Sequence, residues 1–448
     1  MLRRFMITSF FALAAPVAGA QNDPTGPIVI TNVNVFDGSS EELIEGANVV
    51  IDGNLIAEIT TEDVVVAGGR VIDGGGRTLM PGLIDTHTHI MLHSDPVTQL
   101  MTQDAFEQGA RGAARAKAYL DAGFTTVRDL GGNCFGVKNV IDAGVSPGPR
   151  IYCGGASITQ TSGHGDFRMT NDGHPRFDGF AASGVANTTK TTIIADGVDD
   201  VRAAVREMLF RGASQIKVHA GGGVTSFKDP LEAAQYTQEE LNAAVEEAER
   251  YGTYVTVHAQ VNNAVVASLD AGVRTVEHGL IMEEETMVRM AEEGVYWIPQ
   301  AFLALQDVSS NPLFQDPIQN AKLAKVNAGA RQAFEWGIEH GVKTGWGSDV
   351  FGANDIFATF RQEFAFRDEF YEPIEQMQQV TGVNGEILAL SGLKNPYVDG
   401  PLGVIAEGAY ADIILVDGDP TQDIHLLMDS NNIALIMKDG VIYKSDLE

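Results

Sequence analysis

Short apolar runs alternate with amphipathic stretches through the middle of the chain. Residues 103–122 are rich in alanine, with charged residues at helical spacing, and the extended run 124–127 follows them. A Thr-Gln-Glu-Glu sequence, typical of a helix N-terminus, opens the helical pattern at 237–251, which leads into the run 254–258. A repeated order of helix and strand is typical of a parallel sheet covered by helices.

Eight strands of this kind are expected within residues 81–390. They lie at residues 83–86, 124–127, 150–152, 215–219, 254–258, 274–277, 295–298 and 342–346, and a further helical pattern at 198–212 precedes the fourth. This order predicts an α/β fold of the (β/α)8 barrel type. A doubly wound open sheet is the alternative, but no glycine-rich dinucleotide loop follows the first strand.

The two ends of the chain share a different pattern, in which short β-rich runs are separated by Asp-Gly turns. Such runs occur in residues 27–80 and again in residues 398–448. We interpret the two ends as one small β-sandwich domain, built from residues 21–80 and residues 391–448.

The first 20 residues resemble a secretory signal peptide. Arg3 and Arg4 form a basic start, residues 5–17 are mostly apolar, and the small residues 18–20 provide a cleavage site. A frayed N-terminal helix is the alternative, but it fits poorly because Gln-Asn-Asp-Pro follows abruptly. We therefore expect a periplasmic or secreted protein, exported by the general route rather than the twin-arginine route.

The formal net charge of −30 argues against nucleic acid and against anionic membrane surfaces as partners. The many carboxylates instead predict a well solvated surface. The two cysteines, Cys134 and Cys153, could pair in an exported protein, but their spacing does not show it. Two buried free thiols are the expectation that we adopt.

Polar residues gather where the expected strands end. They are His87 and His89 after the first strand, Lys217 in the fourth, His258 and His278 at the ends of the fifth and sixth, and Asp349 after the eighth. In a barrel these strand ends converge on the carboxyl-terminal mouth, where catalytic groups reside.

The types of these residues point to bound metal. His87 and His89 are two apart on an extended segment, so both imidazoles can meet one cation, and His258 and His278 could hold a second. A protonated Lys217 beside two cations would be repelled, so it must be neutral, displaced or converted to a carbamate by carbon dioxide. Asp349 suits a general base, which takes a proton from a metal-bound hydroxide and passes it to the leaving nitrogen. Capping of a helix by Asp349, or of a strand by Lys217, is the structural alternative.

Together these residues carry a resemblance to the amidohydrolase superfamily. The sequence Pro81-Gly82-Leu83-Ile84-Asp85-Thr86-His87-Thr88-His89 is similar to that family's first-strand signature, and residues 408–412 resemble its return into the β-sandwich. The family's metal pattern carries over to His87, His89, Lys217, His258, His278 and Asp349, with none missing. The resemblance implies two divalent metal ions per chain, with zinc as the expected metal, bridged by Lys217 as N6-carboxylysine.

Residues 161–168 and 217–224 resemble prolidase-type dipeptidases and ochratoxin-hydrolysing amidases, which release an amino acid with a free carboxylate. By that resemblance, His164, Arg168 and Tyr236 face the substrate. His164 could donate to the carbonyl oxygen, and Arg168 or Tyr236 could hold the carboxylate. His219 could line the pocket or support the ligands from behind. A polar loop ordered by its own hydrogen bonds is the alternative for His164 and Arg168.

The expected function is therefore a metal-dependent amidase or carboxypeptidase-like dipeptidase that acts on N-acyl amino acids or dipeptides. Small amides of this kind, including ochratoxin-type aromatic amides, are the expected partners, and the family implies a homo-oligomer. A cyclic amide or imidazolone hydrolase, or a deaminase, is an alternative, although deaminases usually need one metal and no bridging lysine. A catalytically silent binding protein is less consistent with the sequence, because none of the metal-ligating residues of the family pattern is missing.

Overall fold

The computed structural model describes residues 26–447, apart from 94–101, 180–189, 303–315 and 351–355. The expected signal peptide, residues 1–20, lies outside the described residues. None of the helices in the described part of the chain is long and apolar enough to cross a bilayer.

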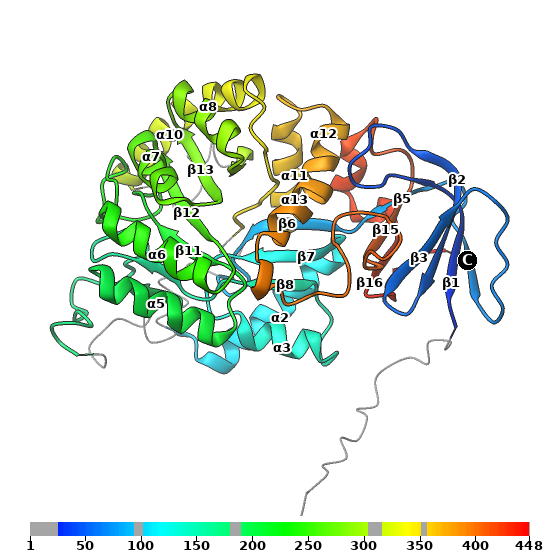
Figure 1. Cartoon of the computed structure of the whole chain (residues 1–448), viewed down its shortest axis with the longest axis horizontal. Coiled ribbons are helices and arrows are strands. Elements are labelled where there is room, and N and C mark those ends of the chain that lie inside the picture. Colours follow the sequence, from blue (N-terminus) through cyan, green and yellow to red (C-terminus); the bar gives the residue numbers. More distant parts are fainter. Residues whose placement is uncertain (1–25, 94–101, 180–189, 303–315, 351–355, 448) are drawn as a thin grey trace, which may run out of the picture.

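Strands from both chain ends join in one eight-stranded sheet (Figure 1). Its strands are β1 (Ile28–Val35), β2 (Ile44–Asp52), β3 (Leu55–Thr60), β4 (Arg70–Asp73), β5 (Thr78–Pro81), β15 (Ile413–Val416), β16 (Ile433–Lys438) and β17 (Val441–Ser445). Antiparallel pairing of β15 with β5 joins the two ends. Strands from the two ends therefore share one hydrogen-bonded sheet. The expected β-sandwich form of this domain stays a prediction.

The middle of the chain is an α/β structure with two parallel sheets. One has the order β6-β7-β8, and the other the order β10-β9-β11-β12-β13-β14. The strands are β6 (Leu83–Thr88), β7 (Phe124–Asp129), β8 (Arg150–Cys153), β9 (Ser157–Thr159), β10 (Thr192–Ile194), β11 (Ile216–His219), β12 (Val255–Val261), β13 (Thr275–Ile281) and β14 (Tyr296–Ile298). Seven of the eight expected strands are thus confirmed as strands.

The eighth expected strand, at 342–346, is not a strand in the structure. Its residues instead make isolated backbone bonds to both sheets. The amide of Trp297 donates to the carbonyl of Lys343 at 2.9 Å, and the amide of Thr86 donates to that of Trp346 at 3.1 Å. On the other side, the amide of Ser214 donates to the carbonyl of Cys153 at 3.0 Å. These bonds bring the ends of the two sheets together.

Helices lie outside these strands (Figure 1). They are α2 (Ala105–Asp121), α3 (Phe135–Asp142), α5 (Val198–Arg211), α6 (Gln238–Arg250), α7 (Asn262–Ala271), α8 (Glu284–Glu293), α10 (Pro317–Glu339), α11 (Ile356–Arg367), α12 (Pro373–Gln378) and α13 (Asn384–Ala389), with a π-turn at Gln379–Val383 and 3-10 turns at Gly392–Lys394, Ile424–Met428 and Ser430–Asn432.

Local sequence signals explain where these helices begin and end. Thr237 and Glu240 form the reciprocal capping box that their spacing predicts at the start of α6. Gly212 ends α5 in a left-handed conformation, with φ of 100°, which glycine adopts without steric cost. Each such stop turns the chain back into the next parallel strand, so the strand ends collect on one side of the sheets.

The two cysteines form a disulfide, so the expectation of two free thiols is wrong. Their Cα atoms are 6.0 Å apart, within the usual range for a bridge. Cys134 follows the end of β7 and Cys153 ends β8, and these strands are neighbours in the parallel sheet. The 19-residue separation along the chain gave no sign of this proximity.

Candidate active site

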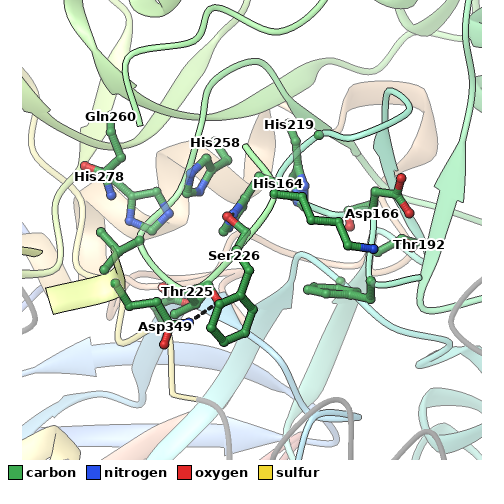
Figure 2. Close-up of a pocket in the computed structure, with 18 of the residues that line it drawn as sticks. His164, Asp166, Thr192, His219, Thr225, Ser226, His258, Gln260, His278 and Asp349 are labelled. Carbon is green, nitrogen blue, oxygen red and sulfur yellow. Dashed lines mark hydrogen bonds between the residues drawn. The ribbon is translucent and has the colours of Figure 1, made fainter. Parts of the chain in front are cut away.

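The expected metal ligands come together at the carboxyl ends of the parallel strands. Ligand atoms of His87, His278 and Asp349 lie within 4.8 Å of one another. The Nε2 atom of His89 lies 3.1 Å from Oδ1 of Asp349, and that of His87 lies 3.4 Å from it. The ring of His258 is 4.4 Å from that of His278 between centroids. Figure 2 shows His258, His278 and Asp349 lining one pocket.

Two of these residues have strained backbones. His278 has φ of 70° and Asp349 has φ of 48°, which residues other than glycine rarely adopt. Such conformations cost about 1–3 kcal/mol each and persist only where neighbours hold them. Here the indole of Trp297 donates to the carbonyl of His278 at 2.6 Å, and the amide of Asp349 donates to the carbonyl of His87 at 2.8 Å. The fold thus holds both side chains toward the cluster at an energetic cost.

A buried carboxylate that the sequence analysis missed orients His87. Oε2 of Glu277 lies 2.8 Å from Nδ1 of His87, and Oε1 accepts from Arg128 at 2.7 Å and from Thr256 at 2.6 Å. Burial raises the pKa of Glu277, but Arg128 and His87 outweigh it and bring that pKa well below its usual range. An ionised carboxylate 2.8 Å from Nδ1 favours the tautomer with the proton on Nδ1, which directs the Nε2 lone pair of His87 to the cluster.

The charge states in the cluster suit a cation. Burial lowers the pKa of His87 to about 4 and that of His278 to about 3, and it brings the pKa of His258 well below its usual value. Neutral imidazoles are therefore present at neutral pH. Burial opposes ionisation of Asp349, but His87 and His89 bring the pKa of Asp349 far below its usual value. Neutral nitrogen donors and an ionised carboxylate are the ligand set of zinc and similar metals.

Lys217 is buried beside these groups, on β11. Its ammonium nitrogen has no hydrogen-bond partner in the described part of the chain. Burial lowers the pKa of Lys217 to about 8, against the opposing effect of Glu277 and Asp349. An unpaired buried amine is costly, so its environment fits a group that is modified or bound to a ligand. The residues present therefore fit a bound metal ion.

His164 and His219 also line the pocket. The ring of His164 stacks on that of His258 with centroids 4.1 Å apart, and the ring of His219 lies 5.1 Å from that of His164. Nδ1 of His164 is 2.8 Å from Oγ of Ser226, and the His164 amide donates to Gln235 at 3.0 Å. Figure 2 labels His164, His219 and Ser226 among the residues that line the pocket.

The structure does not bring the two expected carboxylate-binding residues together. Arg168 lines the pocket, but its guanidinium donates to Asp166 at 2.8 and 2.6 Å. The hydroxyl of Tyr236 donates to the carbonyl of Ala195 at 2.9 Å, and Tyr236 is not among the residues that line the pocket. Lys228, which the sequence analysis did not single out, also lines it.

Apolar side chains form much of the remaining wall of this pocket. It encloses about 720 Å³, a size typical of sites for small organic ligands. The apolar lining residues are Leu92, Phe167, Met169, Val224, Phe227, Leu280, Leu323 and Val326. Phe227 and Met169 are exposed although apolar, so a ligand can cover them.

Comparison with known proteins identifies the family. Residues 78–443 match the model of the amidohydrolase family, and the chain belongs to it. The chain is similar to ochratoxinase from Aspergillus niger, with 30% identity over 442 residues that cover 96% of this chain and 89% of the relative. It is similar to a solved prolidase in complex with N-methylphosphonate-L-proline, with 34% identity, a TM-score of 0.82 and coverage of 94% and 100%. A solved Xaa-Pro dipeptidase with bound methionine has 29% identity, a TM-score of 0.79 and the same coverage. The chain is thus a hydrolase of the type that acts on amides.

Proposed function

We propose that this protein is a metal-dependent amidase or carboxypeptidase-type dipeptidase that releases an amino acid from N-acyl amino acids or dipeptides. The observation that carries the proposal is the buried amine of Lys217, which has no partner among the described residues and lies beside the ionised Asp349 and neutral histidines. The similarity to an ochratoxinase and to prolidases supports an amide substrate.

In this proposal two divalent metal ions, most simply zinc, are held by six side chains: those of His87, His89, His258, His278, Asp349 and a carboxylated Lys217. To form the carbamate, the neutral Lys217 amine bonds to the carbon of carbon dioxide and releases one proton. The product is an anion, so an ammonium that would be repelled becomes a ligand for two cations. Bound metal would lower the pKa of water and polarise the scissile carbonyl.

The protein's own groups then handle the protons. Asp349 accepts a proton as water adds to the carbonyl carbon, and it delivers that proton to the nitrogen as the C–N bond breaks. His164, whose ring stacks on that of His258, donates from its ring to the carbonyl oxygen as charge develops there. Glu277 keeps the ring of His87 in one orientation throughout.

The pocket lining suggests how a substrate is held. An apolar acyl or side-chain group would cover Phe227 and Met169 at the mouth. Arg168 stays the candidate for the substrate carboxylate, because exchange of Asp166 for the substrate would preserve a two-point contact with its guanidinium. Lys228 is a second cation on the same wall.

The alternatives have less support in the site. A deaminase has no need of a bridging lysine, whereas Lys217 is buried beside the cluster. A silent binding protein would be expected to lack ligands, and the candidate set is complete.

Three wider features accompany this proposal. We infer that the two parallel sheets close into a (β/α)8 barrel over residues 81–390, supported by the backbone bonds of residues 342–346. Export to the periplasm or the medium is supported by the disulfide, since such bonds persist mainly in oxidising compartments. Assembly into a homo-oligomer stays a prediction.

A substrate screen tests the proposal. N-acyl amino acids, dipeptides and aromatic amides would be offered to the purified protein with and without a chelator, and released amino acid would be measured. Chelator-sensitive release from substrates with a free carboxylate is expected. If the activity were the same with and without the chelator, after the chelator had removed about two zinc ions per chain, the metal-dependent mechanism would be contradicted.

A further inference from the structure

A buried lysine outside the metal cluster organises the wall that carries His164. Lys322 lies on α10, and its ammonium donates to three backbone carbonyls, those of Gly223 at 2.9 Å, Ser226 at 2.7 Å and Asp229 at 2.6 Å. An ammonium has three N–H donors, so these contacts use all of them. The carboxylate of Asp229, 3.8 Å away, balances its charge.

One of these carbonyls has a second possible donor. The hydroxyl of Ser226 lies 3.2 Å from the Gly223 carbonyl oxygen and 2.8 Å from Nδ1 of His164. A hydroxyl has one proton, so Ser226 can donate to only one of the two. If it donates to Gly223, Nδ1 of His164 must carry the ring proton. If it donates to Nδ1, the ring proton is on Nε2.

We propose that Lys322 fixes the tautomer of His164 by satisfying the carbonyl of Gly223. A carbonyl oxygen has two lone pairs, so the ammonium does not exclude Ser226 from Gly223. Its charge-assisted bond does lower what that oxygen gains from a second donor, so Ser226 gives its proton to Nδ1 of His164 across the shorter contact. The ring proton of the neutral imidazole then sits on Nε2, for which no described residue is an acceptor. This inference rests on the proposed function, in which His164 donates to the carbonyl oxygen, because only the Nε2–H tautomer can do so.

The surrounding contacts leave little freedom to this relay, the chain of hydrogen bonds that runs from Lys322 through the Gly223 carbonyl and Ser226 to His164. A Cβ atom at Gly223 would lie 2.0 Å from a ring carbon of His164, so the backbone must pass directly against the imidazole. The Gly223 amide donates to Asp229 at 2.9 Å, and Gln319 of α10 donates to the carbonyl of Thr225 at 2.6 Å. Lys322 is therefore a positioning residue that acts on His164 through Gly223 and Ser226.

The tautomer can be read directly by ¹⁵N NMR of histidine-labelled, zinc-loaded protein, with the His164 signals assigned by their loss in His164→Asn. The wild type is expected to show Nε2–H. Lys322→Met should move His164 toward Nδ1–H, because Ser226 then donates to the unsatisfied Gly223 carbonyl. An unchanged tautomer in Lys322→Met, or Nδ1–H in the wild type, would overturn the proposal.

Two further variants keep the test decisive. Ser226→Ala removes the relay without touching the buried lysine, so loss of the Nε2–H preference is expected even if Lys322→Met fails to fold; a retained preference would overturn the proposal. Lys325→Met is the matched control, because Lys325 is an exposed lysine on the same helix that pairs with Glu232. It should leave the tautomer unchanged, and a shift there as large as in Lys322→Met would also overturn the relay.

Kinetics separate this inference from the proposed function. Loss of an oxyanion donor costs about 10²–10³-fold in kcat. Lys322→Met should therefore lower kcat in proportion to the fraction of His164 that leaves the Nε2–H tautomer, about tenfold when about nine-tenths of it does, with little change in KM. Adding Ser226→Ala to that variant should cost little more, since both act through one relay. A tautomer that shifts as predicted while kcat is unchanged supports the relay and removes His164 from the proposed chemistry.

Discussion

The carboxylate of Glu277 offers a sharp test of how the site is built. Glu277→Gln keeps the shape of the side chain but removes the negative charge between His87 and Arg128. The variant amide can present its NH₂ to Nδ1 of His87, which would favour the wrong tautomer. Loss of such an orienting partner typically lowers metal affinity about 10- to 100-fold. This corresponds to about 1.4–2.7 kcal/mol of binding free energy.

The same substitution should also lower stability. Arg128 is fully buried, so removing its ionic partner leaves a charge without compensation. Breaking a buried pair in this way costs up to about 3–5 kcal/mol. Metal affinity must therefore be measured on folded protein, by competition for zinc with a chromophoric chelator, alongside thermal unfolding of the metal-free form.

Glu247→Gln is the matched control for this experiment. Glu247 is also a buried carboxylate paired with arginines, Arg206 at 2.8 Å and Arg202 at 3.3 Å, but it contacts no candidate ligand. It should lose stability and keep its zinc affinity. If Glu277→Gln bound zinc as tightly as the wild type, the orienting role of Glu277 would be refuted.

The remaining predictions concern the cluster and its neighbours. Lys217→Ala should abolish turnover and lower metal content measured by mass spectrometry; full activity would exclude a bridging role. Asp349→Asn should retain metal but lose turnover, and loss of metal instead would recast Asp349 as mainly a ligand. Arg168→Ala should raise KM for substrates with a free carboxylate but not for their amides, so equal effects on both would remove it from carboxylate binding. Burial raises the folded-state pKa of Asp85 to about 7, so between pH 4 and 7 the metal-free fold binds more protons than the unfolded chain. Its free energy of unfolding should therefore fall by up to about 1.4 kcal/mol for each unit that the pH rises in this range. Asp85→Asn should flatten that fall, measured by urea unfolding.

Sequence reasoning succeeded where regular periodicity determines position. His87 and Lys217 could be placed at one edge because parallel strands end on the same side of a sheet, and the capping box of Thr237 set the start of a helix within one residue. The strand expected at 342–346 is the exception, since only isolated backbone bonds hold that segment.

Features that depend on contacts between distant segments could not be predicted in this way. The disulfide depends on how the chain turns after β7, and the spacing of the two cysteines carries no such information. Tyr236 was expected at the substrate, yet its hydroxyl points to the carbonyl of Ala195. Glu277 was missed among apolar strand residues, although a carboxylate inside a buried strand is unusual and marks a group with a partner.

We propose that Lys217 carries a carbamate that bridges two metal ions. ¹³C NMR of the zinc-loaded protein, equilibrated with ¹³C-labelled bicarbonate, observes that group directly. We expect a carbamate resonance in the wild type that is absent from Lys217→Ala. A zinc-loaded, active wild type with no such resonance would contradict it.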